Sequence, residues 1–490
     1  MAGAEKPGGM GESGRYSRDD LRRDLARSVV TEPLLTHITD APGNSFDIII
    51  ALNEAFPDGL DNAFDWVKAA LDALTPPPQR LGRAASYVFA RLTGQQILDL
   101  AEKYRAWVKE QGDRAKTPVY RVWEDSDIHP CLTRSLSTIK GDACHRAFCS
   151  FGEGIVWGVL DSGIEKTHPH FSGGVIDEKL SESFVGGSAT EDKYGHGTHV
   201  AGIIAGSWKA DPKQAVVATE MLIEGTEQTE VKLEELGVIS AIAPKATLVS
   251  YKVLDDTGAG KTSALLMAID RIQQVNQHGR HLRIHGVNMS LGYDFNPRWF
   301  ACGQSPVCVE VDRLVRSGVV VVVAAGNAGF SALNLTAQNT TELGFRDMSI
   351  NDPGNAALAI TVGSTHRDMP HRYGVSFFSS RGPTGDGRQK PDLVAPGERI
   401  VSCAAGTFLG GMRAKLPAGA SILYLEQSGT SMAAPHVSGA VAAFLSVRRE
   451  FIGQPEKVKA LFLANTVDLD RERAFQGAGM LDLLKVLQAV

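Results

Sequence analysis

The sequence has few cysteines and no long apolar run. Six cysteines are spread over 490 residues, and none of them forms the Cys-x-x-Cys spacing of zinc or redox sites. Cys144 with Cys149, or Cys302 with Cys308, could close a small disulfide loop in an oxidising compartment, but we expect reduced thiols. No stretch of 18 apolar residues occurs, so we expect no transmembrane helix and no membrane partner.

Targeting signals and strong charge are also missing. The N-terminus lacks the apolar segment and the small-residue cleavage site of a secretory signal peptide. Arg22 and Arg23 are followed by Asp24 rather than by an apolar stretch, so we expect no twin-arginine signal. These features favour a cytoplasmic protein, with secretion left open. The formal net charge of −6 does not favour a nucleic-acid partner.

The character of the chain changes twice along its length. Residues 1–45 are rich in Gly, Arg, Asp and Ser and predict a disordered or partly helical tail. Residues 46–130 contain strand-like and helical patterns in the order β-α-β-β-α-β, which is a ferredoxin-like α+β arrangement. Residues 131–490 alternate near-continuous apolar strands with helices, which is typical of a doubly wound, mostly parallel α/β sheet. Residues 207–238 look like an insertion into this larger domain.

Three short motifs indicate catalysis. In VLDSG an apolar strand ends in Asp161, and in GHGTHVAG a glycine-rich turn places His196 at the start of a small-residue helix. In GTSMAAPHVSG a second turn places Ser431 at the start of another helix. A hydroxyl nucleophile needs a base, and the base needs a carboxylate that fixes its tautomer and stabilises its positive charge. Ser431, His196 and Asp161 can supply these three roles.

The expected secondary structure brings the three residues together. The carboxyl ends of the strands in an open parallel sheet border a crevice, and all three motifs lie at strand ends or helix starts. Ser431 would lie at a helix N-terminus, where its backbone N–H and the helix dipole face the charge that develops during acyl transfer. We expect Pro435 in the first turn of that helix, where a missing N–H costs little.

The motifs, in the chain order Asp, His, Ser, resemble those of the subtilisin-like serine proteases, or subtilases. Asp192 also fits the family's Asp-x-x-Gly-His lead-in, and the resemblance spans about residues 135–490. It implies a subtilisin-like fold and a serine endopeptidase that acts through an acyl-enzyme, with Asp161, His196 and Ser431 as catalytic triad. No cofactor is needed for this reaction, and we assign no metal-ligating residue.

Further segments resemble the substrate cleft of this family. VVAAGN ends in Asn327, which takes the place of the oxyanion-hole asparagine. Two segments resemble the edges that hold a protein or peptide substrate as an added strand and wall its P1 pocket. We expect the floor of the P1 pocket within residues 343–353. The expected substrate-binding residues are Gly258, Ala259, Gly260, Ser290, Leu291 and Gly292.

The N-terminal domain resembles the inhibitory prodomain that precedes subtilases, both in its element order and in its ending VYRVWED. The resemblance implies a zymogen whose own prodomain sheet covers the substrate-binding helices. The strand pattern and the distance to the first catalytic motif place the cleaved bond within residues 128–135, near Cys131 and Leu132. An unrelated accessory domain is the alternative interpretation.

Other functions fit less well or stay open. A lipase-type site is disfavoured because the nucleophile context is GTSMA rather than Gly-x-Ser-x-Gly. A protease held latent until a partner or effector releases it stays open, and so does a non-catalytic binding protein on the same fold. His168 and His170 could suggest zinc together with His196, but His196 already has a role. We expect His199 and His436 to pack helices.

The insertion occupies the place where many secreted subtilases carry a calcium loop. It contains no compact set of Asp and Asn ligands, so a calcium site there is doubtful. We expect its carboxylates to form a solvated face.

Overall fold

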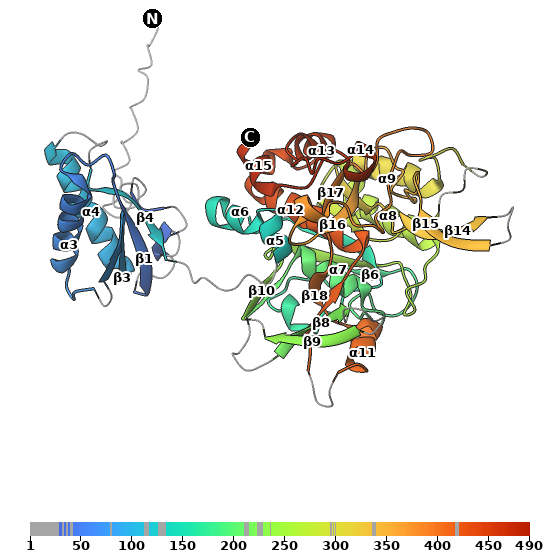
Figure 1. Ribbon diagram of the computed structural model, residues 1–490, viewed down its shortest axis with the longest axis horizontal. Coiled ribbons are helices and arrows are strands. Elements are labelled where there is room, and N and C mark those ends of the chain that lie inside the picture. Colours follow the sequence, from blue (N-terminus) through green and yellow to red (C-terminus); the bar gives the residue numbers. More distant parts are fainter. Residues whose placement is uncertain are drawn as a thin grey trace, which may run out of the picture. The chain divides into compact units, whose positions relative to one another are not determined.

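The chain forms two compact units, Met1–Ile128 and His129–Val490, which are described separately (Figure 1). The computed structural model describes residues 29–31, 34–35, 38–39, 43–78, 81–111, 117–125, 134–209, 215–222, 229–235, 237–294, 296, 298, 300–335, 340–416 and 421–490. The domain boundary expected at residues 130–131, and the expected cleavage site near Cys131 and Leu132, lie outside the described residues.

The first unit has the predicted ferredoxin-like order. Its strands form one antiparallel sheet in the order β2-β3-β1-β4, in which Ile50 of β1 pairs with Val88 and with Val122. Apolar residues at helical spacing, such as Ala63, Val67 and Leu71, bury one face of α3 in the core. The elements are β1 (Ser45–Leu52), α3 (Gly59–Asp72), β2 (Leu81–Ala84), β3 (Tyr87–Thr93), α4 (Gly94–Gln111) and β4 (Val119–Glu124).

This core also contains residues that we assigned to the N-terminal tail. The Thr31 backbone N–H donates to Val122 O over 3.0 Å, and the Val122 N–H donates to Val29 O over 2.8 Å. The expectation of a tail up to residue 45 was therefore wrong for these positions. Their apolar side chains are spaced for burial, but the charged residues around them obscured that pattern. The buried residues of this segment are Val29, Val30, Leu34, Leu35 and Ile38.

The second unit is built on a seven-stranded parallel sheet in the order β17-β16-β13-β12-β5-β11-β6. This confirms the predicted doubly wound α/β fold. The strands are β5 (Val156–Asp161), β6 (Glu182–Ser183), β11 (Thr247–Lys252), β12 (Gly286–Met289), β13 (Val320–Ala324), β16 (Ile360–His366) and β17 (Leu393–Glu398).

Helices cover both faces of this sheet, so each strand is buried on two sides. Val159 of β5 belongs to the core under α7 (His196–Ile204) and α12 (Thr430–Val447). Its neighbour Leu160 belongs to the core under α8 (Thr262–Val275) and α9 (Pro306–Arg316). The other helices are α5 (Arg134–Thr138), α6 (Gly141–Phe148), α10 (Pro370–Tyr373), α13 (Pro455–Ala464), α14 (Arg473–Gln476), α15 (Leu483–Gln488), η2 (Pro169–Phe171), η3 (Gln277–Gly279) and η4 (Arg449–Phe451).

Helix α12 is the central helix of this unit. Within the described parts of the chain it is the one helix with the length and apolar composition to cross a membrane, but 83% of that window is buried inside the unit. Its fifteen buried residues include Ala433, Val437 and Ala440, which lie against the sheet. The apolar composition of α12 is therefore accounted for by its place in the core.

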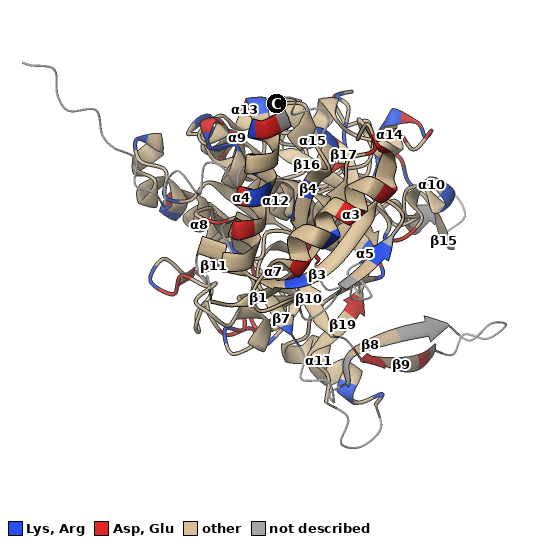
Figure 2. Cartoon of the chain, turned by 90° about the vertical axis from the view of Figure 1, so that its left-hand side faces the viewer, with Lys and Arg blue, Asp and Glu red and all other residues tan. Residues whose placement is uncertain are grey.

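The insertion forms a β-hairpin on a second sheet. Strands β8 (Ala215–Leu222) and β9 (Thr229–Glu235) extend β18 (Ile400–Cys403) and β19 (Tyr424–Gln427) in the order β18-β19-β8-β9. Val231 and Leu233 of β9 pack into a small core with α11 (Gly406–Arg413). Among the acidic residues of β9, which are red in Figure 2, Glu230 and Glu235 are exposed and Glu234 is partly buried. Two short strands, β7 (Ser207–Lys209) and β10 (Val238–Ser240), close the base of the insertion.

The second unit contains one more β-hairpin among its described residues. Strands β14 (Phe330–Leu335) and β15 (Thr340–Phe345) project from its body (Figure 1).

Cys144, Cys302, Cys308 and Cys403 are free thiols, so neither of the two cysteine pairs considered above closes a disulfide loop.

Candidate active site

Asp161 and His196 are in direct contact. Asp161 is the last residue of β5, at the carboxyl end of a central strand, and His196 is the first residue of α7. The imidazole Nδ1–H donates to Asp161 Oδ1 over 2.8 Å. The same oxygen also accepts the Ser162 backbone N–H over 2.8 Å, so two donors hold it in place. This bond leaves Nε2 of His196 without a proton, so it can act as a base.

The surroundings of His196 favour its charged form. Burial of the imidazole opposes a positive charge, but three other effects outweigh it: the negative charge of Asp161, the hydrogen bond that His196 donates to Asp161 and the negative charge of Asp192. The pKa of His196 consequently lies above its ordinary value. An imidazolium formed during a reaction would be stabilised in this position.

Ser431 lies in the first turn of α12, and its hydroxyl is bonded to the strand edge. Ser431 Oγ donates to Ser290 O over 3.1 Å, and Ser290 Oγ donates to Ser431 O over 2.8 Å. Among the described residues no hydrogen bond joins Ser431 to His196. The structure thus unites Asp161 with His196 and leaves the Ser431 hydroxyl on the neighbouring carbonyl.

Pro435 is the sixth residue of α12, and our expectation that it lies in the first turn was wrong. A proline in the helix interior cannot donate the backbone bond to the carbonyl four residues earlier, which here belongs to Ser431. Ser290 Oγ takes over that role. The local pattern of small residues after Ser431 did not reveal this pairing, because Ser290 lies on a strand far away in sequence.

The side chain of Asn327 is oriented by the start of α12. Its Oδ1 accepts the Thr430 backbone N–H over 2.9 Å and the Thr430 hydroxyl over 3.0 Å. The amide nitrogen is therefore left to donate elsewhere. A methyl group placed on Gly429 would lie 3.4 Å from Asn327 Nδ2 and 3.7 Å from the Ser431 backbone N. Asn327 Nδ2 and the Ser431 backbone N thus both lie within 4 Å of one point next to Gly429.

A cleft of about 340 Å³ begins beside His196. Five of the six expected substrate-binding residues line it. The sixth, Ala259, does not, since its carbonyl and its N–H are both bonded within the turn to Asp255. The lining residues are Tyr194, His196, Val253, Leu254, Gly258, Gly260, Lys261, Thr262, Leu265, Ser290, Leu291, Gly292 and Tyr293.

The segment that we expected to form the P1 floor meets the cleft only at its end. A Cβ on Gly292 would overlap the side-chain amide of Asn351, and Tyr293 and Asp352 exchange backbone hydrogen bonds of 2.9 and 3.0 Å. Leu343 and Phe345 instead lie exposed on β15. Asn351 lies within the expected range and contacts Gly292 at the edge of the cleft, and nothing in the sequence indicated which residue of that range makes the contact.

Two aromatic rings near His196 were also missed. The Tyr194 ring centroid lies 6.5 Å from that of His196 and 5.3 Å from that of Phe408 on α11. Helix α11 is attached to the turn before His196, because the Thr407 N–H donates to Lys193 O over 2.8 Å. The GHGTH motif alone carries no signal for Phe408, which comes from a segment more than 200 positions further along the chain.

The other histidines of the motifs are structural. His170 Nε2 lies 3.1 Å from Gly202 O and His199 Nε2 3.2 Å from Leu425 O, which makes both nitrogens donors to carbonyls. Burial lowers the pKa of each to about 3. His436 donates to Met432 O over 2.8 Å, and burial lowers its pKa to about 4. His168 Nε2 likewise lies 2.7 Å from Leu423 O. Nitrogens that donate to carbonyls cannot at the same time bind zinc.

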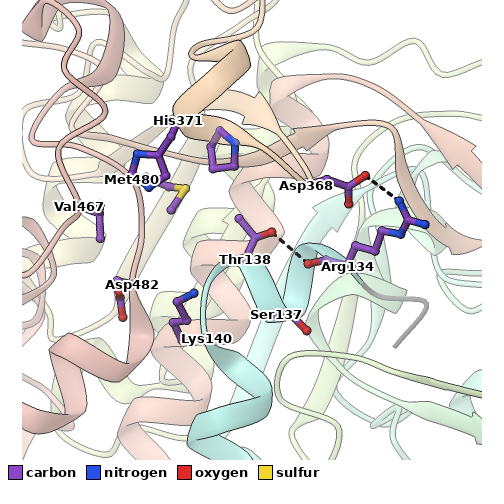
Figure 3. A pocket seen from close by; sticks show the side chains of 10 residues that line it. Arg134, Ser137, Thr138, Lys140, Asp368, His371, Val467, Met480 and Asp482 are labelled. Atoms are coloured by element: carbon purple, nitrogen blue, oxygen red, sulfur yellow. Dashed lines mark hydrogen bonds and ion pairs between the residues drawn. The ribbon is translucent and has the colours of Figure 1, made fainter. Parts of the chain in front are cut away.

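A second cavity, of about 440 Å³, lies at α5 and contains no member of the triad (Figure 3). Its rim carries the ion pair of Arg134 with Asp368, 3.1 Å between Nη1 and Oδ2, and the two side chains point toward each other in Figure 3. The hydroxyl of its one lining serine, Ser137, donates to Asp142 over 3.4 Å rather than to a histidine. This cavity therefore lacks a nucleophile with its base.

Comparison with known proteins identifies a family and several relatives. Residues 152–480 match the model of the Subtilase family. Serine protease AprX of Bacillus subtilis (strain 168) is 29% identical over 334 residues, which are 67% of this chain and 65% of that protein. Subtilisin E of the same strain is 31% identical over 313 residues, 64% of this chain and 60% of that protein. Pyrolysin of Pyrococcus furiosus is 32% identical over 287 residues, 52% of this chain and 18% of that protein.

The chain thus spans less than two thirds of the length of each of these three relatives. The family match begins beyond the first unit and extends through the second, from before Asp161 to beyond Ser431. Because this match covers more than half of the 490 residues, the chain belongs to the subtilase family.

Proposed function

We propose that this protein is a serine endopeptidase in which Asp161, His196 and Ser431 are the catalytic residues. The observation that carries the proposal is the 2.8 Å contact of Asp161 with His196, beside a helix start that presents Ser431 and orients Asn327. Membership of the subtilase family supports the same assignment.

The first half of the reaction forms an acyl-enzyme. The Ser431 hydroxyl leaves the Ser290 carbonyl, turns to His196 and attacks the substrate carbonyl carbon, while Nε2 of His196 takes its proton. The electron pair of the carbonyl moves to its oxygen, where Asn327 Nδ2 and the Ser431 N–H stabilise the negative charge. His196 then protonates the leaving amine, and the peptide bond breaks.

The second half of the reaction restores the enzyme. Water loses a proton to His196 and attacks the ester carbon, and Ser431 leaves with that proton as a hydroxyl. Asp161 keeps the imidazole oriented in both halves and stabilises its charged form. The residues of the protein supply every group that these steps use.

The cleft suits an extended peptide. Gly258 and Gly260 form one edge, and Ser290, Leu291 and Gly292 form the other. Glycines at both edges let a substrate backbone approach closely and add as a strand. The side chains of Val253, Leu254 and Leu265 make the wall next to His196 apolar.

The first unit acts in this proposal as an inhibitory prodomain, and the protein is made as a zymogen. The support is its ferredoxin-like element order and its place before the family domain in the chain. The bond to be cleaved lies within residues 128–135, which are largely outside the described part of the chain.

A fluorophosphonate probe tests the catalytic assignment, because it labels only an activated serine. The wild-type chain should be labelled, Ser431→Ala should not, and Ser446→Ala, which changes another serine of α12, should be labelled like wild type. No labelling of wild type, with or without its first unit, would support a non-catalytic binding protein. Labelling only after removal of that unit or addition of a partner would indicate a latent protease.

A further inference from the structure

A second carboxylate lies behind the Asp161–His196 pair. Asp192 is almost fully buried, with 2% of its surface exposed. Its Oδ1 accepts the Ser162 hydroxyl over 2.9 Å and the Gly195 N–H over 2.8 Å. Its Oδ2 accepts the Thr198 N–H over 2.8 Å and the Thr198 hydroxyl over 2.6 Å. All four partners donate to the carboxylate, and such hydrogen bonds favour its ionised form.

These bonds connect Asp192 to both members of the pair. Ser162 donates its hydroxyl to Asp192, accepts the Gly197 N–H over 2.9 Å, and donates its own N–H to Asp161 over 2.8 Å. Gly195 and Gly197 flank His196 in the chain. Asp192 thus fixes the backbone on both sides of the imidazole and, through Ser162, the carboxylate that the imidazole touches.

The charge of Asp192 also acts on His196 without contact. No donor in the described residues reaches Oδ2 of Asp161, so the triad carboxylate has no further neighbour that would hold it. The pKa of Asp192 lies above its ordinary value, because burial outweighs the opposite effect of its hydrogen bonds from Thr198 and Gly195. The negative charge of Asp192 adds to that of Asp161 in raising the pKa of His196.

We propose that Asp192 is a positioning residue for peptide hydrolysis. Through Ser162 it keeps Asp161 and His196 correctly oriented toward each other, and its negative charge stabilises the imidazolium. The expected change in kcat rests on the proposed function. The effect of Asp192 on the pKa of His196 can be measured without catalysis. The proposal adds Asp192 to the three residues of the proposed triad as a fourth residue that acts on the reaction, through His196 and Asp161.

Other groups near the imidazole have to be considered in a pH experiment. Asp161 approaches from β5, Asp192 and Tyr194 from the turn before α7, and His199 lies one turn along α7. Burial lowers the pKa of His199 to about 3, so it stays neutral while His196 titrates. Phe408 contributes an uncharged ring 6.1 Å from the imidazole.

The decisive variant is Asp192→Asn. An asparagine of similar size cannot accept all four hydrogen bonds, and it removes the charge. We expect kcat to fall roughly 10- to 100-fold, the loss that follows from removing hydrogen bonds to a charged group. The acid limb of the kcat profile should move to lower pH, because the imidazolium loses a stabilising charge.

Two further variants separate the possible causes. Ser162→Ala removes the connection to Asp161 but keeps the charge of Asp192, so kcat should fall while the acid limb stays in place. Asp312→Asn is the matched control: Asp312 is also buried, at 8% exposed, and also accepts a backbone N–H, from Leu358 over 2.8 Å. It should leave both kcat and the acid limb as in wild type.

A measurement in the inactive Ser431→Ala chain makes the test independent of turnover. The pKa of His196, followed by NMR of its ring, should be lower in Asp192→Asn than in the parent and unchanged in Asp312→Asn. A folded Asp192→Asn chain with the parent's His196 pKa and the wild-type kcat would overturn the inference. If Asp192→Asn does not fold, a Ser162→Ala enzyme with unaltered kcat would overturn it instead. An inactive wild-type chain would contradict the proposed function. The NMR titration would still show whether Asp192 raises the pKa of His196.

Discussion

Ser431 and Ser290 exchange two hydrogen bonds, each serine donating its hydroxyl to the carbonyl of the other. Pro435 makes this exchange possible, because it leaves the Ser431 carbonyl without a helical partner. The exchange attaches the start of α12 to the end of β12, at the point where the substrate edge begins. It also places the Ser431 hydroxyl on the Ser290 carbonyl rather than on His196.

Ser431→Ala should remove activity without disturbing this attachment. The variant loses only the bond from Ser431 Oγ to Ser290 O, and the bond from Ser290 Oγ to the Ser431 carbonyl remains. We expect the melting temperature to stay close to that of wild type and kcat to fall by about 10⁶. Thermal unfolding and a peptide assay check both expectations, and more than a few per cent of wild-type turnover would contradict the assignment of the nucleophile.

Asn327→Ala should lower kcat by roughly 10²–10³, since one of the two proposed hydrogen-bond donors to the oxyanion is lost. Thr430→Val tests how that donor is oriented. Valine keeps the backbone N–H that bonds to Asn327 Oδ1 and removes the hydroxyl bonds to Asn327 and to the Gly326 N–H. We therefore expect a smaller fall in kcat with little change in KM. Equal kcat in Thr430→Val and wild type would show that the hydroxyl does not orient the amide.

The rate should depend on one group that titrates on the acid side. His196 must be neutral to accept a proton, and its pKa is raised because Asp161 and Asp192 outweigh the effect of burial. The protonated, inactive form therefore persists to higher pH than for an ordinary histidine. The acid limb of kcat/KM should have its midpoint above about 6.5. A profile that is flat between about pH 5 and 8 would argue against a histidine base.

Gly292→Ala should close the P1 pocket. A Cβ at this position overlaps the side-chain amide of Asn351, so either the strand edge or the pocket floor must move. We expect kcat/KM to fall most for peptides with a large P1 side chain and least for those with P1 glycine. Gly410→Ala on α11 is the control, since a methyl group there meets no atom within 4 Å. A uniform loss for all P1 residues would place Asn351 outside the pocket.

The sequence predicted most of the fold and only part of the site, for a physical reason. The strands β5 and β11 and the residues Asp161, His196 and Ser431 could be predicted because their signals are local: apolar runs, tight turns and short motifs. Phe408 could not, because it approaches His196 through a contact between segments far apart in the chain. Asn351 lies within the expected residues 343–353, but its contact with Gly292 could not be predicted for the same reason. Such contacts leave no periodic pattern in one sequence.

Pro435 and the segment before residue 46 show the limits of local rules. A proline five residues after a helix start can lie in the first turn, or it can lie further on and leave one backbone hydrogen bond of the helix unmade. Only the contact with the Ser290 hydroxyl, which takes the place of that bond, decides between the two. The apolar residues Val29, Val30 and Leu34 lie among charged neighbours, so composition favoured a tail. The structure buries them because β4 offers Val122 as a partner for the backbone of this segment.

The proposed prodomain should show itself in processing. Wild-type protein should lose roughly its first 130 residues on maturation, while Ser431→Ala should keep them, because an inactive enzyme cannot cut its own chain. Mass spectrometry of both proteins gives the outcome directly. A fully active wild-type chain that stays uncleaved would make the first unit an accessory domain.

The same unit should inhibit the mature enzyme when added as a separate chain, and its length should matter. A segment that starts before Val29 keeps the five buried residues Val29, Val30, Leu34, Leu35 and Ile38 of its core. A segment that starts at residue 46 lacks them and forfeits about 1.5–3 kcal/mol for each fully buried Val, Leu or Ile. Such a loss is comparable to the entire stability of a small domain. The longer segment should therefore fold and inhibit at low concentration, and the shorter one should be largely unfolded by circular dichroism and inhibit weakly. Equal inhibition by both segments would mean that residues 29–38 contribute nothing to the inhibitory fold, and no inhibition by the folded longer segment would contradict the prodomain role itself.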